Sequence, residues 1–376
     1  MNPIQLLAPS NPLGNPAPFW FLELFKILGF TLHLVPMNLW YAGIILIVIL
    51  GIFGKGNTKI AANHLANSMP IIIALGINFG IIPLLFTQVA YYKFYYTSSI
   101  LMAWPWLGVI GLLIFAYYGM YIYTIKLRSG NVTALARICA WISMICFILI
   151  GFLFTNNMSL MTNADRWVEI FRGSNIAGAA TGLALNLSEP TFVPRWLMML
   201  GIACTTVGAY IAVDGAYFSR KESGEYHAFA PKFGILIYLI GIVVYAGMGS
   251  WYFFGTLPQT IVTSIMNAAE LKILVASTAL FPIVVLLFMI AQTRILKKYM
   301  AALIGASQFV FLGLNAISRQ WVQNYEASRY FDVSGETVHI QWSPMIVFLI
   351  LFVAGVSIVI WMIAKAVQAS SKTAAA

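Results

Sequence analysis

Long apolar segments, separated by short polar ones, make up most of this chain. An apolar run of about 20 residues is long enough to cross the hydrocarbon core of a bilayer as a helix. Nine runs of this kind are present, at 19–53, 66–92, 99–125, 135–155, 192–218, 233–256, 272–293, 299–318 and 344–366. The pattern predicts an all-α fold, a polytopic transmembrane bundle of about nine helices.

The first run, at 19–53, is too long for one perpendicular crossing of roughly 30 Å at about 1.5 Å per residue. We expect it to be tilted, to kink at Pro36, or to project from the membrane. Its most continuous apolar part is 41–53, so His33 is expected in the half nearer the amino end.

The composition agrees with a membrane protein, since 61% of the residues are hydrophobic and only 9% are charged. A water-soluble domain carries about 25% charged residues. Residues 1–18 are rich in Pro and Asn and carry no charge, so we interpret them as a polar extracytoplasmic leader rather than a signal peptide. The predicted organisation is this leader, a helix bundle over 19–368, and a flexible cytoplasmic tail over 369–376.

The positions of the basic residues predict how the bundle lies in the membrane. With the amino end outside, the inner segments hold Lys55, Lys59, Lys126, Arg128, Arg137, Arg220, Lys221, Lys232, Arg294, Lys297, Lys298, Lys365 and Lys372. The outer segments hold only Lys93, Arg166, Arg172, Arg195, Lys272, Arg319 and Arg329. Because cytoplasmic loops carry the excess of Lys and Arg, we expect the amino end outside and the carboxyl end inside. The expected location is the cytoplasmic (inner) membrane.

The net charge of +10 does not indicate a nucleic-acid partner. The basic residues lie in short loops, where membrane topology requires them. The lipid bilayer is therefore the first expected partner. The two long loops, at 156–191 and 319–343, fall on the expected outer side, so a large soluble partner is expected there.

Motifs of soluble enzymes are absent from the sequence, which has no Gly-rich phosphate loop, no HExxH, no GxSxG and no CxxCH. Glu23 and Asp214 are the only deeply apolar carboxylates, and they lie at opposite ends of their runs. We interpret Asp214 as part of an ion pair at the inner interface, where Arg220 and Lys221 follow it. A role in a proton path is the alternative.

His33 is the only histidine inside a predicted span. Polar residues are costly in hydrocarbon, so they usually face the interior of the bundle and often mark a functional site. A neutral imidazole is a good axial ligand of haem. A lone helical histidine is also commonly a hydrogen-bonded core residue, and both interpretations stay open at this point.

Two residues of the fifth run favour ligation of a b-type haem by His33. Met198 lies near the start of that run, at a comparable outer depth, and its thioether is a suitable second ligand. Arg195 lies one turn earlier on the same face, where it is expected to pair with a haem propionate. Met345 is a second thioether candidate. The expected metal ligands are His33 and Met198.

Polar residues on two other runs are further candidates for cofactor binding. Gln308, Asn315 and Arg319 are spaced i, i+7 and i+11, so they lie along one stripe of the eighth run. Their functional interpretation is contact with a quinone head or a propionate, and their structural interpretation is hydrogen bonding between helices. Asn78 lies within a GxxxG pattern of the second run, a pattern whose first use is close helix packing.

Two short motifs stand in the first two runs. One is His33 with Pro36 in Leu-His-Leu-Val-Pro, and the other is Gly76-Ile-Asn-Phe-Gly80. The pair resembles subunit I of the cytochrome bd quinol oxidases, in which a first-helix histidine in a similar context binds haem. The resemblance implies a cytochrome bd-like subunit that holds haem b or interacts with a quinol.

Several features of that family have no counterpart here. Pro194, in Phe192-Val-Pro194, stands where the family has its other haem-ligand histidine. Gly80 is not followed by the family's Glu-Phe-Gln-Phe-Gly string, and the family's long quinol-binding loop is missing. We therefore expect a divergent relative that does not itself reduce oxygen.

The residues and the resemblance together favour an electron-transfer subunit of a respiratory complex, that is, a quinol-linked oxidoreductase subunit. It would pass electrons between the quinone pool and an extracytoplasmic redox partner such as a c-type cytochrome. Its expected cofactors are haem b and a quinone. The alternatives are a haem-free membrane anchor of a redox complex and a small-molecule transporter, against which stands the lack of two-half symmetry in the spans.

Overall fold

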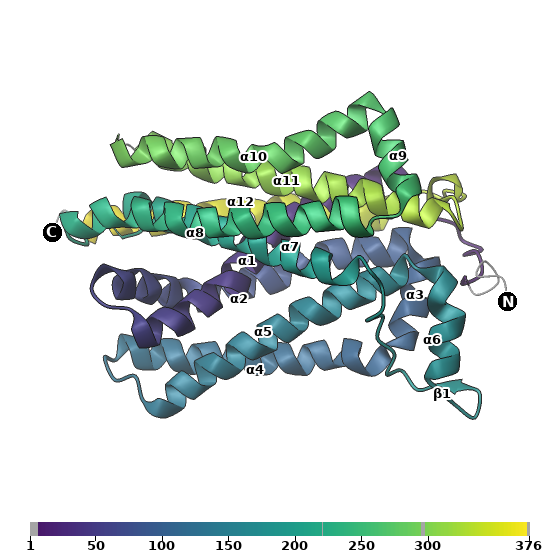
Figure 1. Ribbon diagram of the computed structural model, residues 1–376, viewed down its shortest axis with the longest axis horizontal. Helices are drawn as coiled ribbons and strands as arrows, with labels where there is room; N and C mark the ends of the chain where they lie inside the picture. The colour runs from purple at the N-terminus through teal and green to yellow at the C-terminus, as the bar shows by residue number, and fades with distance from the viewer. Residues whose placement is uncertain (1–6, 220, 295–297, 374–376) are drawn as a thin grey trace.

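The computed structural model describes residues 7–219, 221–294 and 298–373. Within these residues, nine helices are long and apolar enough to cross a membrane, as the hydropathy pattern predicted. They are α1 (Phe19–Phe53), α2 (Asn57–Ala90), α4 (Ala103–Arg128), α5 (Ala134–Met161), α7 (Phe192–Tyr217), α8 (Gly224–Ser250), α10 (Ala269–Arg294), α11 (Lys298–Ser328) and α12 (Trp342–Thr373). Figure 1 shows them running along the long axis of the molecule. The predicted all-α transmembrane bundle is confirmed.

Three of the helices extend about nine or ten residues past one end of the apolar runs that predicted them. α2 begins at Asn57 rather than at 66, α8 begins at Gly224 rather than at 233, and α11 continues to Ser328 rather than ending at 318. Hydropathy marks only the part of a helix that lies in hydrocarbon, whereas helical hydrogen bonding continues into the interfacial region. The polar first turns of α2 consequently place His64 on a helix and not in a loop.

The shorter elements gather at the end of the bundle where α1 begins (Figure 1). They are α3 (Tyr92–Leu101), a 3-10 turn (Ala164–Arg166), α6 (Trp167–Gly173), β1 (Asn175–Ile176), β2 (Ala179–Ala180), α9 (Gln259–Asn267) and a second 3-10 turn (Val333–Gly335). A π-helical turn, Trp251–Thr256, continues α8 toward the same end. β1 and β2 form a hairpin whose loop residues, Ala177 and Gly178, both have positive φ (51° and 82°), as a type I′ turn requires.

α7 and α8 pack against each other with their backbones in contact. A Cβ atom at Gly208 would lie 2.6 Å from the carbonyl oxygen of Gly234, and one at Gly201 would lie 2.5 Å from the amide nitrogen of Tyr245. No side chain fits at such distances, so the glycines allow the two helices to approach closely. α1 packs against α2, α5, α7 and α11, which places it at the centre of the bundle.

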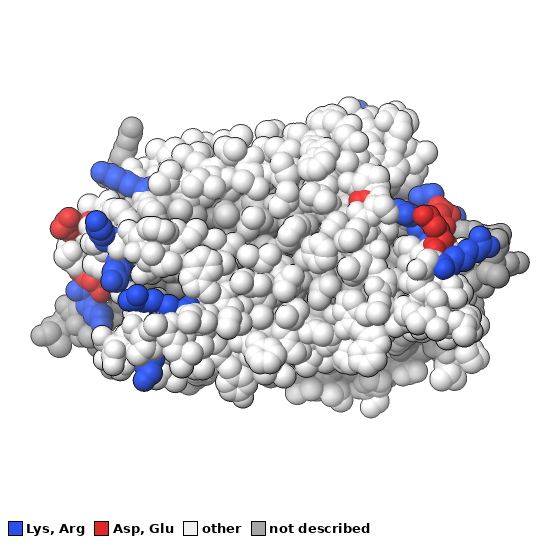
Figure 2. Space-filling view, turned by 60° about the horizontal axis from the view of Figure 1, so that its bottom comes forward, with Lys and Arg blue, Asp and Glu red and all other residues white. Residues whose placement is uncertain are grey.

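Charged side chains gather at the two ends of the bundle and leave its middle nearly free of them (Figure 2). The end where α1, α4, α7 and α12 begin carries both signs of charge, and we name it the mixed end. Lys and Arg predominate at the opposite end, which we name the basic end. A band without charges matches the hydrocarbon core of a bilayer. By the positive-inside rule, we expect the basic end to face the cytoplasm.

The leader and the last long loop pair with each other at the mixed end. The amide of Asn15 donates to the carbonyl oxygen of Thr337 (2.8 Å), and the carbonyl oxygen of Asn15 accepts from the amide of His339 (2.9 Å). Residues 1–6 of the predicted leader and 374–376 of the predicted tail lie outside the described residues. The helix α12 itself continues to Thr373.

Candidate cofactor site

His33 lies on α1, against α2. Its Nδ1 atom is 2.8 Å from the carbonyl oxygen of Gly76. A carbonyl oxygen only accepts hydrogen bonds, so Nδ1 carries the proton and the neutral ring keeps its lone pair on Nε2. Within the described residues, Nε2 has no hydrogen-bond partner. The imidazole is thus held in one orientation, and its second nitrogen is left for a ligand.

Two glycines of α2 make room for aromatic rings of α1. A Cβ atom at Gly80 would lie 2.8 Å from Cε1 of His33, and one at Gly76 would lie 2.2 Å from the indole of Trp40. The rings of His33 and Trp40 have their centroids 5.9 Å apart, at an interplanar angle of 76°. The GxxxG pattern of the second run therefore accommodates the histidine and the tryptophan.

Arg319 reaches the same region from α11. Its guanidinium carbon lies 4.7 Å from the ring centroid of Phe30, and the Phe30 and His33 centroids are 6.5 Å apart. In the part of the chain that the structure describes, Arg319 forms no salt bridge with a carboxylate. A guanidinium that is not engaged in a direct ion pair is suited to a carboxylate or carbonyl group of a ligand.

Arg195, which was predicted to pair with a propionate, has a partner within the protein. Its Nη2 atom lies 2.5 Å from Oε1 of Glu326, and its guanidinium carbon lies 5.2 Å from the ring centroid of Tyr252. Removing one partner of a buried ion pair leaves an uncompensated charge, at a cost of about 3–5 kcal/mol. Arg319 is therefore the guanidinium that can bind a ligand without that loss.

Met198 lies on α7, which packs against the helix α1 that carries His33. It packs against an apolar cluster that contains Leu34, the residue that follows His33 in the chain. Its Sδ atom lies beside α8, 3.6 Å from the position that a Cβ atom at Gly249 would take. The imidazole of His33 is thus directed toward α2 and the thioether of Met198 toward α8, and ligation by both stays a prediction.

Two other candidates from the sequence lie elsewhere. Asn78 is exposed, and its Nδ2 atom donates to the carbonyl oxygen of Ala74 in its own helix (2.8 Å). Met345 packs against the separate apolar cluster around Phe21. Neither side chain is placed beside His33.

Gln308 and Asn315 connect helices deep in the bundle. The Nε2 atom of Gln308 donates to the hydroxyls of two threonines of α7 (3.1 and 3.2 Å), and its Oε1 atom accepts from the hydroxyl of Tyr238 on α8 (3.2 Å). Asn315 is hydrogen-bonded to Tyr245 of α8. Gln308 thus uses both its donor and its acceptor to hold α7, α8 and α11 together, which is the structural interpretation of this stripe.

A hydrogen-bonded cluster at the basic end was not apparent from the sequence. Nδ1 of His64 lies 3.1 Å from Oδ2 of Asp214, and Nε2 of His64 lies 3.0 Å from Oε1 of Glu222. The hydroxyls of Tyr226 and Ser219 also donate to Oδ2 of Asp214. These residues come from α2, from α7, from the loop that follows it, and from α8.

Within the described residues, the charged partner of Asp214 is His64. Arg220 lies outside the described residues, and Lys221 is exposed. His64 comes from a position 150 residues earlier in the chain. Its only signal in the sequence is a histidine two residues before the apolar run at 66–92.

Another buried polar cluster surrounds Glu23 and Lys26 at the mixed end. The Nζ atom of Lys26 donates to Oε1 of Gln323 (2.8 Å) and lies 4.2 Å from the ring centroid of Tyr91. Glu23 accepts a hydrogen bond from Asn324. Burial, and then the nearby Glu23 carboxylate, raises the pKa of the Tyr91 phenol above its ordinary value. The charged groups at the start of α1 are thus anchored to α11.

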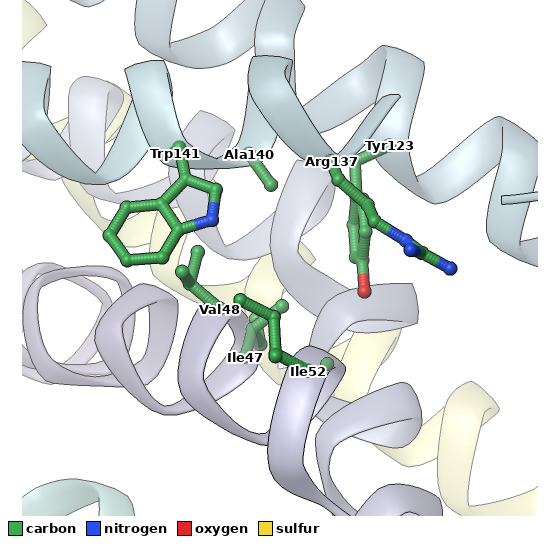
Figure 3. Close-up of a pocket in the computed structure, with 8 residues that line it drawn as sticks. Ile47, Val48, Ile52, Tyr123, Arg137, Ala140 and Trp141 are labelled. Carbon is green, nitrogen blue, oxygen red and sulfur yellow. The ribbon is translucent and has the colours of Figure 1, made fainter. Parts of the chain in front are cut away.

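An apolar pocket opens at the basic end, between α1 and the pair α4 and α5 (Figure 3). Its lining consists of Ile47, Val48, Gly51, Ile52, Tyr123, Arg137, Ala140 and Trp141. It adjoins the last turns of α1, whereas His33 lies in the other half of that helix. The pocket is separate from the region around His33.

Comparison with known proteins identifies the fold. No family model matches the chain, and no curated protein matches it in sequence. Among solved structures, the chain is similar to a chain of the bd oxidase from Geobacillus thermodenitrificans, at 13% sequence identity and a TM-score of 0.64. The likeness covers 96% of this chain and 99% of that one. The chain has a bd oxidase fold.

The bd oxidase fold confirms the divergent structural relationship that the two motifs predicted. The structural likeness extends over nearly the whole chain, whereas the two sequence motifs lie only in α1 and α2. Because the two chains differ at most positions, the likeness establishes the arrangement of the helices. The ligands, partners and chemistry of this chain have to be inferred from its own residues.

Proposed function

We propose that this chain is a membrane electron-transfer subunit of a respiratory complex, and that His33 ligates a b-type haem through Nε2. The observation that carries the proposal is the hydrogen bond from Nδ1 to the carbonyl oxygen of Gly76. Metal-binding histidines commonly donate their other ring N–H to a backbone carbonyl, which selects the tautomer and orients the ring. The tautomer and the orientation of the His33 ring therefore suit Nε2 to serve as an axial ligand of the haem iron.

The neighbours of His33 suit the rest of such a cofactor. Phe30 supplies an apolar face, and Arg319 supplies a positive charge for a propionate or for the carbonyl of a quinone. Met198 is our proposed second ligand, because it is a flexible thioether in the same region. When bound, the haem would accept and donate single electrons, and an imidazole–thioether pair suits a low-spin carrier.

The position of His33 supports a partner at the mixed end. His33 lies in the half of α1 nearer that end, where the long loops and short helices gather. We propose that a redox subunit, such as a c-type cytochrome, docks there and exchanges electrons with the quinone pool through this chain. The proposed location is the cytoplasmic membrane, with the mixed end outside.

We also propose that this subunit does not reduce oxygen. The part of α2 that follows Gly80 carries no carboxylate, and Glu326 at the mixed end is held in its pair with Arg195. A site that reduces oxygen needs a free proton-donating group beside the reacting atoms themselves, and neither of these two segments supplies one. Oxygen uptake by the purified subunit with quinol should stay at the level of protein-free detergent, and a robust rate would refute this part.

A reduced-minus-oxidised absorbance spectrum of the purified protein tests the haem proposal. We expect a Soret difference in the wild type and its loss in His33→Ala, since the proposed ligand is then missing. His339→Ala is the matched control, because His339 is exposed on an outer loop and should leave the spectrum unchanged. A wild type without haem, or an unaltered spectrum in His33→Ala, would replace this proposal by the haem-free membrane anchor.

A further inference from the structure

We infer that His64, Asp214 and Glu222 form a proton-transfer site that leads from the basic end into the bundle. The inference is independent of the haem proposal. The side chains of Glu222, His64 and Asp214 are 23%, 18% and 4% exposed, so the three groups form a graded path from the surface to the interior. Each consecutive pair is within hydrogen-bond distance, at 3.0 and 3.1 Å.

The imidazole of His64 has a carboxylate oxygen at each ring nitrogen. An ionised carboxylate accepts and does not donate, so both contacts are hydrogen bonds only when the three groups hold two protons. Either the imidazole carries both protons, or the imidazole carries one and a carboxyl carries the other. One transfer is balanced as follows: the carboxyl of Glu222 gives its proton to Nε2, and Nδ1 gives its proton to the carboxylate of Asp214. The net charge of the site is unchanged, and the imidazole is left as the other tautomer.

The hydroxyls around Asp214 prepare it to hold and release this proton. Tyr226 donates to Oδ2 at 3.1 Å, and Ser219 donates to the same atom and also contacts Nδ1 of His64. Hydroxyl groups both donate and accept, so each can reverse its bond when Asp214 is protonated. The ionisable groups that interact with Asp214 from the neighbouring elements are Tyr210 and Tyr226. The loops and helix ends at the same end of the bundle also carry Lys55, Lys59, Arg128, Lys221, Glu225 and His227.

Polar residues continue inward from Asp214 along α7. Tyr210 and Thr206 precede it at intervals of four residues, so the three lie on one face of the helix, about 6 Å apart along its axis. The hydroxyl of Tyr210 donates to Ser68 (3.3 Å), and the hydroxyl of Thr206 accepts from Asn38 of α1 (3.0 Å). These bonds extend the polar path to the centre of the bundle.

Two buried amide oxygens point to water along this path. Oδ1 of Asn38 and Oε1 of Gln292 have no hydrogen-bond partner within the described residues, and both side chains are at least nine-tenths buried. Asn38 is bonded to Thr206, and Gln292 donates to the carbonyl oxygen of Ala212, two residues before Asp214. Buried polar atoms of this kind usually bind ordered water, which would bridge the gaps between the hydroxyls.

The path continues from the centre toward the mixed end through α10 and α11. The hydroxyl of Tyr245, which is bonded to Asn315, donates to the carbonyl oxygen of Thr278 (3.3 Å). The hydroxyls of Thr278 and Ser318 are 2.7 Å apart, and Ser318 precedes Arg319. These hydroxyls extend the set of hydrogen-bonded polar groups from the centre of the bundle toward the mixed end.

The rate at which protons enter vesicles that contain the full chain tests this inference. The measurement does not depend on whether a haem or quinone is bound. Purified protein is reconstituted in phospholipid vesicles that enclose a pH-sensitive dye, and a potassium diffusion potential drives protons inward. We expect a rate above that of protein-free vesicles, reduced about tenfold in Asp214→Asn. Glu225→Gln, an exposed carboxylate at the same end, is the matched control and should conduct as the wild type does.

A second variant keeps the test valid if Asp214→Asn does not fold. Glu222→Gln alters the most exposed member of the trio, keeps its shape and should also reduce the rate. Infrared spectra of the folded proteins are recorded between pH 4 and pH 9. In the wild type, a carboxyl or imidazole band should change reversibly with pH, and this change should be absent from both His64→Gln and Asp214→Asn. Wild-type vesicles no faster than protein-free ones, or equal rates in all folded variants, would overturn the inference.

Discussion

The carbonyl oxygen of Gly76 accepts a hydrogen bond from Nδ1 of His33, at 2.8 Å, between two helices that are apolar over most of their length. A carbonyl oxygen has two lone pairs, so Gly76 can serve its own helix and the imidazole together. The approach is open because Gly80, one turn later, has no side chain at the place that the ring occupies. One bond therefore decides which nitrogen of His33 can act as a ligand.

Replacing Gly80 by Ala should displace the imidazole. The added Cβ atom would lie 2.8 Å from Cε1 of His33, and overpacking of this kind costs about 1–3 kcal/mol. We expect a shifted or weakened haem band together with a lower unfolding temperature in detergent. Gly108→Ala is the control, because a Cβ atom there would have open space within 4 Å. Identical spectra for the two variants would show that Gly80 does not position the ligand.

Replacing Met198 by Leu should lower the reduction potential of the haem while the fold is kept. The two side chains have similar volumes, so the cost in stability is less than about 1.5 kcal/mol, whereas methionine ligation tends to raise the potential. A redox titration monitored by absorbance measures the change. Met199→Leu, at a partly buried neighbour, should leave the potential as it is. An unchanged potential in Met198→Leu would exclude Met198 as a ligand.

Replacing Arg319 by Gln should weaken binding of the cofactor by about tenfold, since a hydrogen bond to a charged group contributes about 1.5–3 kcal/mol. Titration of the apoprotein with haem, or of the purified protein with a quinone analogue, distinguishes which ligand Arg319 contacts. Arg329→Gln removes a positive charge from the same end and serves as control, since Arg329 is exposed and paired with Asp165. Equal affinities in both variants would remove Arg319 from the site.

Replacing Gly208 by Ala should separate α7 from α8. The new Cβ atom would lie 2.6 Å from a backbone oxygen of Gly234, which cannot move without shifting the helix. We expect a loss of stability of about 1–3 kcal/mol or more, seen as a lower midpoint of thermal unfolding. Gly247→Ala, on α8, meets no atom within 4 Å and should change little.

The orientation of the bundle is tested by reporter fusions. The excess of Lys and Arg at the basic end predicts that this end faces the cytoplasm, so a fusion after Lys372 should be active only there. A fusion within the 156–191 loop should report the opposite side. An extracytoplasmic signal at the carboxyl end would reverse the placement of both the His33 region and the His64 cluster.

The sequence by itself determined the class of the protein and the positions of its spans, and it singled out His33 as a candidate ligand. These follow from local properties, because a helix long and apolar enough to span a bilayer is recognised from its own residues. The motif of Gly76 and Gly80 also pointed to the correct pair of helices, since both glycines contact rings of α1. The same local rules left open which side chains meet across helices.

Only the tertiary structure decided the pairings. Arg195 and Arg319 look alike in sequence, yet Glu326 neutralises the first and leaves the second available. His64 lies outside the apolar runs of the sequence, but it stands on α2, and the contacts that α2 makes bring it to Asp214 and Glu222. The reason is physical: hydropathy reports the transfer of one segment into lipid, whereas a hydrogen bond between residues 150 positions apart depends on helix packing that no single segment encodes.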